Sequence, residues 1–137
     1  GNLRMSQRSK YGWVPGTLIC LAITGVSHQP VAIPDIVEFD HQDKIIHALV
    51  YGFLATVWLR WFLTFKPPFS AGLWTIMLTS AFGVTDELHQ HFVPGRTTEF
   101  LDWLADTLGA VLATVCYLKW PFYRSILESS KRSRRAD

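Results

Sequence analysis

The chain has 137 residues, 49% of them apolar and 14% aromatic, with a formal net charge of +2. This is the length of one domain. Its charged residues, 18% of the total, are gathered in short stretches between long apolar runs. A soluble helix bundle needs charged faces at helical spacing instead, so the composition argues against that class and favours a membrane protein.

Four apolar runs follow one another, each with about the 20 residues needed to cross the hydrocarbon core of a bilayer. They cover residues 11–34, with Trp13–Ser27 as the most apolar part, and then 45–65, 67–85 and 101–120. We therefore predict an all-α polytopic membrane protein with four transmembrane helices in a bundle.

The positions of lysine and arginine predict the orientation of these helices. Basic residues precede the first run, follow the second and follow the fourth, whereas the connections 28–43 and 86–100 contain Arg96 as their only lysine or arginine. Since these residues in short loops stay in the cytoplasm, both termini should be cytoplasmic. We expect a basic segment over 1–10, a membrane domain over 11–120 and a basic cytoplasmic tail over 121–137.

The first run is expected to be a retained helix, because it lacks the small-residue cleavage site of a signal peptide. Gly1–Arg4 precede Met5, so we expect the native chain to begin at Met5. Cys20 and Cys116 lie inside apolar runs. They are expected to be small buried side chains and not a disulfide or a metal pair.

The polar residues are concentrated in one stretch, Thr85–Gly109, between two uncharged segments. Its five acids are Asp86, Glu87, Glu99, Asp102 and Asp106, and they are accompanied by Gln90, two histidines (His89 and His91) and one strong base, Arg96. Ionisable groups beside membrane segments are costly and usually functional. We therefore predict that this stretch contains the functional site.

Helical spacing predicts that three polar stripes meet in one outward-facing pocket. Residues three or four apart share one side of a helix, and each stripe changes from polar at its outer end to small residues deeper in the membrane. Small residues allow helices to pack closely. The predicted ligand-binding residues are Asp43, Lys44, His47 and Tyr51 in the second helix, Asp86, Glu87 and Gln90 in the third, Arg96 in the loop, and Asp102 and Asp106 in the fourth.

These residues also resemble the signature of a known family. The pattern comprises Asp43-Lys44-x-x-His47, then Asp86-Glu87-x-x-Gln90-x-Phe92-x-Pro94-Gly95-Arg96, and finally Asp102-x-x-x-Asp106-x-x-Gly109. Over about residues 40–116 the chain resembles the VanZ-like membrane proteins. The resemblance implies a helical protein of the bacterial cytoplasmic (inner) membrane, in a family whose founding member is associated with resistance to the lipoglycopeptide teicoplanin.

One position departs from that family's pattern. Asp106 stands where the family usually has asparagine. A carboxylate at this depth must either be protonated or have gained a cationic partner.

The chemistry of the residues leaves three functions open. Lys44 and Arg96 suit an anion, and His47 suits proton transfer near neutral pH. The first function is a pocket that binds an anionic amphiphile or a lipid-linked cell-envelope intermediate, with an effect on susceptibility to glycopeptides. The second is a hydrolase or transferase acting on a lipid-linked phosphate, and the third is a small transporter or assembly factor.

Whether the protein is an enzyme stays open at this point. The candidate catalytic residues are His47, Asp86, Glu87 and Asp102, because histidine and carboxylates serve as general acids and bases. A simpler interpretation is that the charges only form ion pairs at the membrane edge.

No metal ligands and no cofactor are assigned, although Asp86 and Glu87 together suit a divalent cation. Glu87 and His91 have the spacing of a zinc pair, but neither cysteine nor an HExxH motif supports it. The expected partner is the lipid bilayer. Nucleic acid is not expected, because no nucleic-acid-binding module accompanies the basic C-terminal run.

Overall fold

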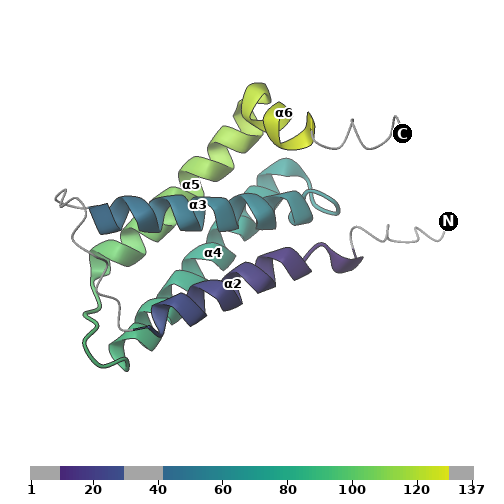
Figure 1. The fold of residues 1–137 in the computed structure, drawn as a ribbon. Coiled ribbons are helices and arrows are strands. Elements are labelled where there is room, and N and C mark those ends of the chain that lie inside the picture. The colour runs from purple at the N-terminus through teal and green to yellow at the C-terminus, as the bar shows by residue number, and fades with distance from the viewer. Residues whose placement is uncertain (1–9, 30–41, 130–137) are drawn as a thin grey trace.

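The computed structural model describes residues 10–29 and 42–129, and all the regular secondary structure in them is helical (Figure 1). The helices are α2 (Val14–Ser27), α3 (Gln42–Phe62), α4 (Pro68–His91), α5 (Phe100–Lys119) and α6 (Pro121–Ser129). Helices α2 to α5 run alternately back and forth along the molecule, and α6 turns away from the end of α5. The all-α prediction is confirmed for these residues.

Prolines mark the start of three helices. Pro67 is the N-cap of α4 and Pro68 its first residue, and Pro121 begins α6. Pro15 lies in the first turn of α2. Proline is favourable there, because its fixed φ suits the helix and its missing N–H would have had no partner within the helix.

Two of the described helices, α3 and α5, are long and apolar enough to cross a membrane. With 21 and 20 residues they extend about 30 Å, the thickness of the hydrocarbon core. Helix α4 has 24 residues but is not apolar enough by the same standard, and α2 has only 14. Residues 30–34 of the first predicted run lie outside the described residues. The four-span topology therefore stays a prediction.

Large apolar side chains cover the outside of the bundle, and small ones fill parts of its interior. Large apolar residues that are at least 60% exposed occur on each helix from α2 to α5, among them Leu21, Leu49, Phe53, Met77, Leu88 and Leu112. The buried side of α4 consists largely of small residues, among them Ala71, Gly72 and Gly83. Lipid tails can contact apolar surfaces of this kind, whereas small residues let helices approach one another.

The closest approach of two helices is between α3 and α5, where glycines face each other. A Cβ atom at Gly109 would overlap the backbone of Ala48 on α3. A Cβ atom at Gly52 would lie 3.2 Å from the carbonyl oxygen of Gly109. Because neither glycine has a side chain, the two backbones come into contact at this crossing.

Aromatic residues and α6 close the end of the bundle where α3 and α5 end. Trp58, Phe62 and Tyr117 belong to the buried core there. Tyr123 of α6 packs against that core, and its hydroxyl lies 3.2 Å from the Thr56 hydroxyl of α3. The sequence analysis did not predict α6. The basic run after it lies outside the described residues.

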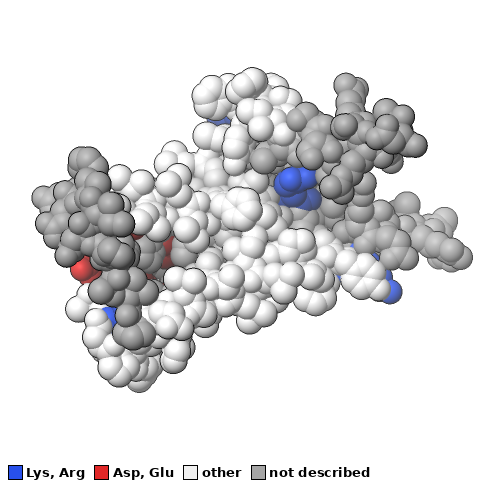
Figure 2. Space-filling view, viewed as in Figure 1, with Lys and Arg blue, Asp and Glu red and all other residues white. Residues whose placement is uncertain are grey.

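Charged residues are separated between the two ends of the molecule. In Figure 2 the visible aspartates and glutamates lie at one end of the bundle, and most of the visible lysines and arginines lie toward the other. Cys20 and Cys116 are both free cysteines, and both are partly exposed, whereas we had expected them to be buried.

We predict that Gly109→Ala destabilises the protein, because its methyl group would meet backbone atoms of Ala48, which cannot rotate away. Overpacking of this kind costs about 1–3 kcal/mol. Thermal unfolding in detergent measures the effect. Gly25→Ala in α2 is the matched control, because a Cβ atom there has nothing within 4 Å. Equal stability of the two variants would contradict the proposed close crossing.

Candidate functional site

Four helix ends meet at the acidic end of the bundle. Because the helices alternate in direction, the C-terminal ends of α2 and α4 lie beside the N-terminal ends of α3 and α5 (Figure 1). The structure thereby brings together the polar residues of all three predicted stripes. It adds α2, which the sequence analysis had not included.

Lys44 lies at the centre of a group of three carboxylates. Its Nζ atom is 2.7 Å from Asp43 Oδ2 and 2.6 Å from Glu99 Oε2. It is also 2.6 Å from Asp102 Oδ1. The ammonium donates hydrogen bonds to Asp43 and Glu99, and Asp102 completes the group as an ion-pair partner. Lys44 therefore neutralises the neighbouring acids, whereas we had expected it to hold a ligand anion.

Asp86 connects three helices through neutral donors. Its Oδ2 atom accepts hydrogen bonds from Ser27 Oγ and from the Tyr51 hydroxyl, each at 3.1 Å. Gln90 Nε2 donates to the same oxygen at 3.3 Å. Asp86 is only 3% exposed, so these contacts fix its carboxylate inside the bundle. Sequence reasoning missed Ser27, whose only signal was a lone hydroxyl at the end of an apolar run.

His47 and Asp106 form a pair between α3 and α5. His47 Nδ1 lies 2.8 Å from Asp106 Oδ1, and the Asp106 side chain is fully buried. The sequence had left open whether this aspartate is protonated or has a cationic partner, and the structure places an imidazole beside it. The second oxygen, Oδ2, lies 3.0 Å from where a Cβ atom of Gly83 would be, so any larger residue at this position of α4 would press against it.

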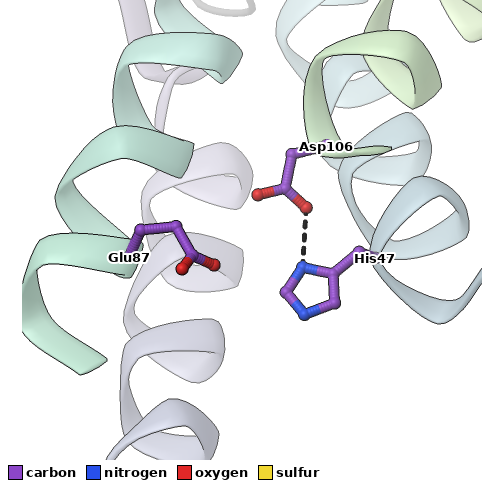
Figure 3. A group of neighbouring side chains, drawn as sticks. All are labelled: His47, Glu87 and Asp106. Carbon is purple, nitrogen blue, oxygen red and sulfur yellow. Dashed lines mark hydrogen bonds and ion pairs between the residues drawn. The ribbon is translucent and has the colours of Figure 1, made fainter. Parts of the chain in front are cut away.

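Glu87 faces the His47–Asp106 pair from α4 (Figure 3). Its Oε2 atom accepts a hydrogen bond from the backbone N–H of Glu99 at 3.3 Å. Its neighbour Asp86 faces α2 and α3 instead, because consecutive residues of a helix point in different directions. The two adjacent carboxylates therefore do not share one cation.

Arg96 follows a tight turn and fastens the loop to α2. The Arg96 N–H donates to the Val93 carbonyl at 3.2 Å, with Pro94 and Gly95 between them. Gly95 has φ +82°, so the turn has the proline and glycine of a type II turn. Proline followed by glycine is typical of such a turn.

The Arg96 guanidinium binds carbonyl groups at the C-terminal end of α2. Nε and Nη2 donate to the Gln29 carbonyl at 3.3 and 3.2 Å, and Nη2 donates to the Val26 carbonyl at 3.4 Å. These carbonyls carry the partial negative charge of a helix end. Among the described residues, Arg96 makes no salt bridge to Glu87 or Asp102, and its Nη1 atom donates no hydrogen bond.

A cavity of about 440 Å³ opens between α2 and α3, with α4 behind it. Its polar part is formed by Ser27, Asp43, His47, Tyr51, Asp86, Gln90 and Arg96. Its apolar wall is formed by Ile19, Ala22, Ile23, Val26, Ile46 and Val50. Six of the ten predicted ligand-binding residues therefore line one cavity. Lys44, Glu87, Asp102 and Asp106 do not line it.

The two other histidines of the acidic stretch do not enter this cavity. His89 pairs with His28 of α2, with Nε2 and Nδ1 3.3 Å apart. His91 is exposed at the end of α4 and stacks edge-on against Phe92. His91 and Glu87 are not brought together as ligands of one ion.

The fold and this site define a helical membrane protein with a polar site at one end of its bundle. The chain belongs to the VanZ/LLP1 family, whose sequence model matches residues 3–124. The resemblance stated from the sequence motifs is thus confirmed. Neither the curated proteins nor the solved structures contain a significant match to the chain.

Proposed function

We propose that this protein binds a membrane amphiphile in the cavity between α2 and α3. The observation that carries the proposal is the division of that cavity into a polar end and an apolar wall. Its volume of about 440 Å³ lies within the roughly 300–1,000 Å³ of typical ligand sites. An amphiphile would place its head group among the polar residues and its chain against the isoleucines and valines.

The charges of the cavity limit which head groups fit. Lys44 is occupied by three acids, so Arg96 is the cation that lines the cavity with donors left over. Asp43 and Asp86 also line it and offer acceptors. The head group therefore carries one anionic group for Arg96 and hydroxyl or ammonium donors for the acids. A lipid-linked intermediate of the cell envelope has this combination of groups.

The proposed place of this cavity is the outer leaflet of a bacterial cytoplasmic membrane. The lysines and arginines before α2, between α3 and α4 and after α5 support four spans with both termini in the cytoplasm. The alternating directions of α2 to α5 fit the same topology. In that position the protein would meet envelope lipids and lipoglycopeptides, which connects the proposal with altered susceptibility to glycopeptides.

A second candidate function is a hydrolase or transferase, and the His47–Asp106 pair favours it. A carboxylate that is hydrogen-bonded to one ring nitrogen fixes the tautomer and orientation of a histidine. The other ring nitrogen is then left for proton transfer. His47 also lines the cavity. Turnover of a lipid-linked phosphate by the purified protein, lost in His47→Gln while lipid binding is kept, would establish this function in place of simple binding.

The topology is tested by cysteine labelling in spheroplasts. In a background with Cys20 and Cys116 replaced by alanine, a cysteine at Thr98 between α4 and α5 should react with an impermeant maleimide. A cysteine at Thr64 between α3 and α4 should react only after lysis. Labelling of Thr64→Cys in intact spheroplasts, with Thr98→Cys protected, would place the cavity on the cytoplasmic side and contradict the proposal.

The role of Arg96 is tested by Arg96→Lys. Lysine keeps the charge but loses the planar fork, so a charge-assisted contact of about 1.5–3 kcal/mol should be lost. We expect binding of phosphatidylglycerol, measured by native mass spectrometry, to weaken by about 10- to 100-fold.

Two comparisons make that measurement specific. Lys66→Gln removes a cation at the opposite end of the bundle and should leave lipid binding unchanged. The melting temperature without lipid shows whether Arg96 acts only by holding α2. If Arg96→Lys loses stability but binds lipid as the wild type does, Arg96 only anchors the loop.

A further inference from the structure

His47, Glu87 and Asp106 form a group at the junction of α3, α4 and α5. Each offers one ligand atom, and these atoms lie within 4.8 Å of one another. Figure 3 shows the Glu87 carboxylate extending from α4 toward the His47–Asp106 pair. The three side chains come from distant parts of the sequence, so their convergence is a property of the fold.

Two oxygens of this group are buried and have no hydrogen-bond partner among the described residues. They are Asp106 Oδ2 and Glu87 Oε1. The Asp106 side chain is 0% exposed, and Figure 3 shows its second oxygen directed toward α4, the helix that carries Glu87. Leaving a buried carboxylate oxygen without a donor or a cation is costly. The two oxygens therefore call for a donor or a cation that the described residues do not supply.

A neighbouring group of three carboxylates differs from this one because it contains a cation. Ligand atoms of Asp43, Glu99 and Asp102 also lie within 4.8 Å of one another, but the Lys44 ammonium lies among them. In the group of His47, Glu87 and Asp106, the imidazole supplies at most one positive charge for two carboxylates. One cluster thus contains its own cation and the other does not.

We propose that His47, Glu87 and Asp106 bind one divalent transition-metal ion of the Zn²⁺ or Mn²⁺ class. One imidazole nitrogen and two carboxylate oxygens are the ligand types these ions accept. Two ligands bonded to one ion at about 2.0–2.2 Å lie at most about 4.4 Å apart, so small side-chain rotations within this group, whose ligand atoms lie within 4.8 Å, complete the site. A divalent ion with two carboxylates and a neutral imidazole has no net charge, which suits an apolar surrounding.

Three protein ligands leave at least one coordination position open. His47 lies at the edge of the cavity, so the ion would lie between the cavity and α5. The metal site goes beyond the proposed amphiphile binding and does not depend on it. Metal loading is therefore measured in detergent without added lipid, so that the two proposals can fail separately.

The test uses the full-length protein with any affinity tag removed, stripped with EDTA and equilibrated with ZnCl₂, MnCl₂ or CoCl₂. We expect one equivalent of metal per chain by elemental mass spectrometry, and a visible Co²⁺ absorption band typical of nitrogen and oxygen ligands. Glu87→Gln and Asp106→Asn each keep the size of the side chain. They should weaken binding by at least about 10- to 100-fold, the range already seen for outer partners of metal ligands.

His91→Gln is the matched control, because it removes an imidazole one turn from Glu87 that is not part of the group. It should bind metal as the wild type does. Gly83→Ala keeps all three ligands but places a methyl group 3.0 Å from Asp106 Oδ2, and it should weaken binding even if the ligand variants fail to fold. Absence of stoichiometric binding in the wild type, or undiminished binding in Asp106→Asn, overturns the proposal.

Discussion

The need to neutralise carboxylates at the end of an apolar bundle organises this structure. The Lys44 ammonium meets three of them within 2.7 Å and thereby connects α3 to the start of α5. Asp86 is stabilised differently, by hydroxyl and amide donors from α2, α3 and α4. Among the three acids around Lys44, Asp102 is the most buried, so breaking its pair with Lys44 would leave its charge without compensation. The polar contacts therefore fix how the four helix ends fit together.

Close helix packing supports the same arrangement from inside the bundle. Because Gly109 lets α5 contact the backbone of α3, His47 can reach Asp106 across a single interface. Gly83 leaves room on α4 for the second Asp106 oxygen. Small residues thus do more than tighten the bundle, since they also set the distances between the charged groups. The apolar cavity wall lies between α2 and α3, where the packing is looser.

Much of this could be predicted from the sequence, and the missing parts have a common cause. The spacing of Lys44 and His47 on α3 correctly predicted that both face the other polar stripes. The Pro94-Gly95 pair is likewise typical of the turn found before Arg96. Spacing within a helix identifies a face but not its neighbour. Glu99 and Asp102 beside Lys44, and the carbonyl partners of Arg96, therefore could not be predicted. The contribution of Ser27 was hidden for the same reason, because nothing in an apolar run indicates where its last hydroxyl will lie.

The central claim is that the cavity between α2 and α3 holds an amphiphile, and photo-cross-linking tests it most directly. p-Benzoylphenylalanine is introduced either at Ile46, which lines the cavity, or at Leu49, which is exposed on the same helix and does not line it. After irradiation in native membranes, the account predicts that Ile46 captures one lipid class far above its membrane abundance, while Leu49 captures the bulk phospholipids. The same lipid mixture at both positions would contradict a selective site.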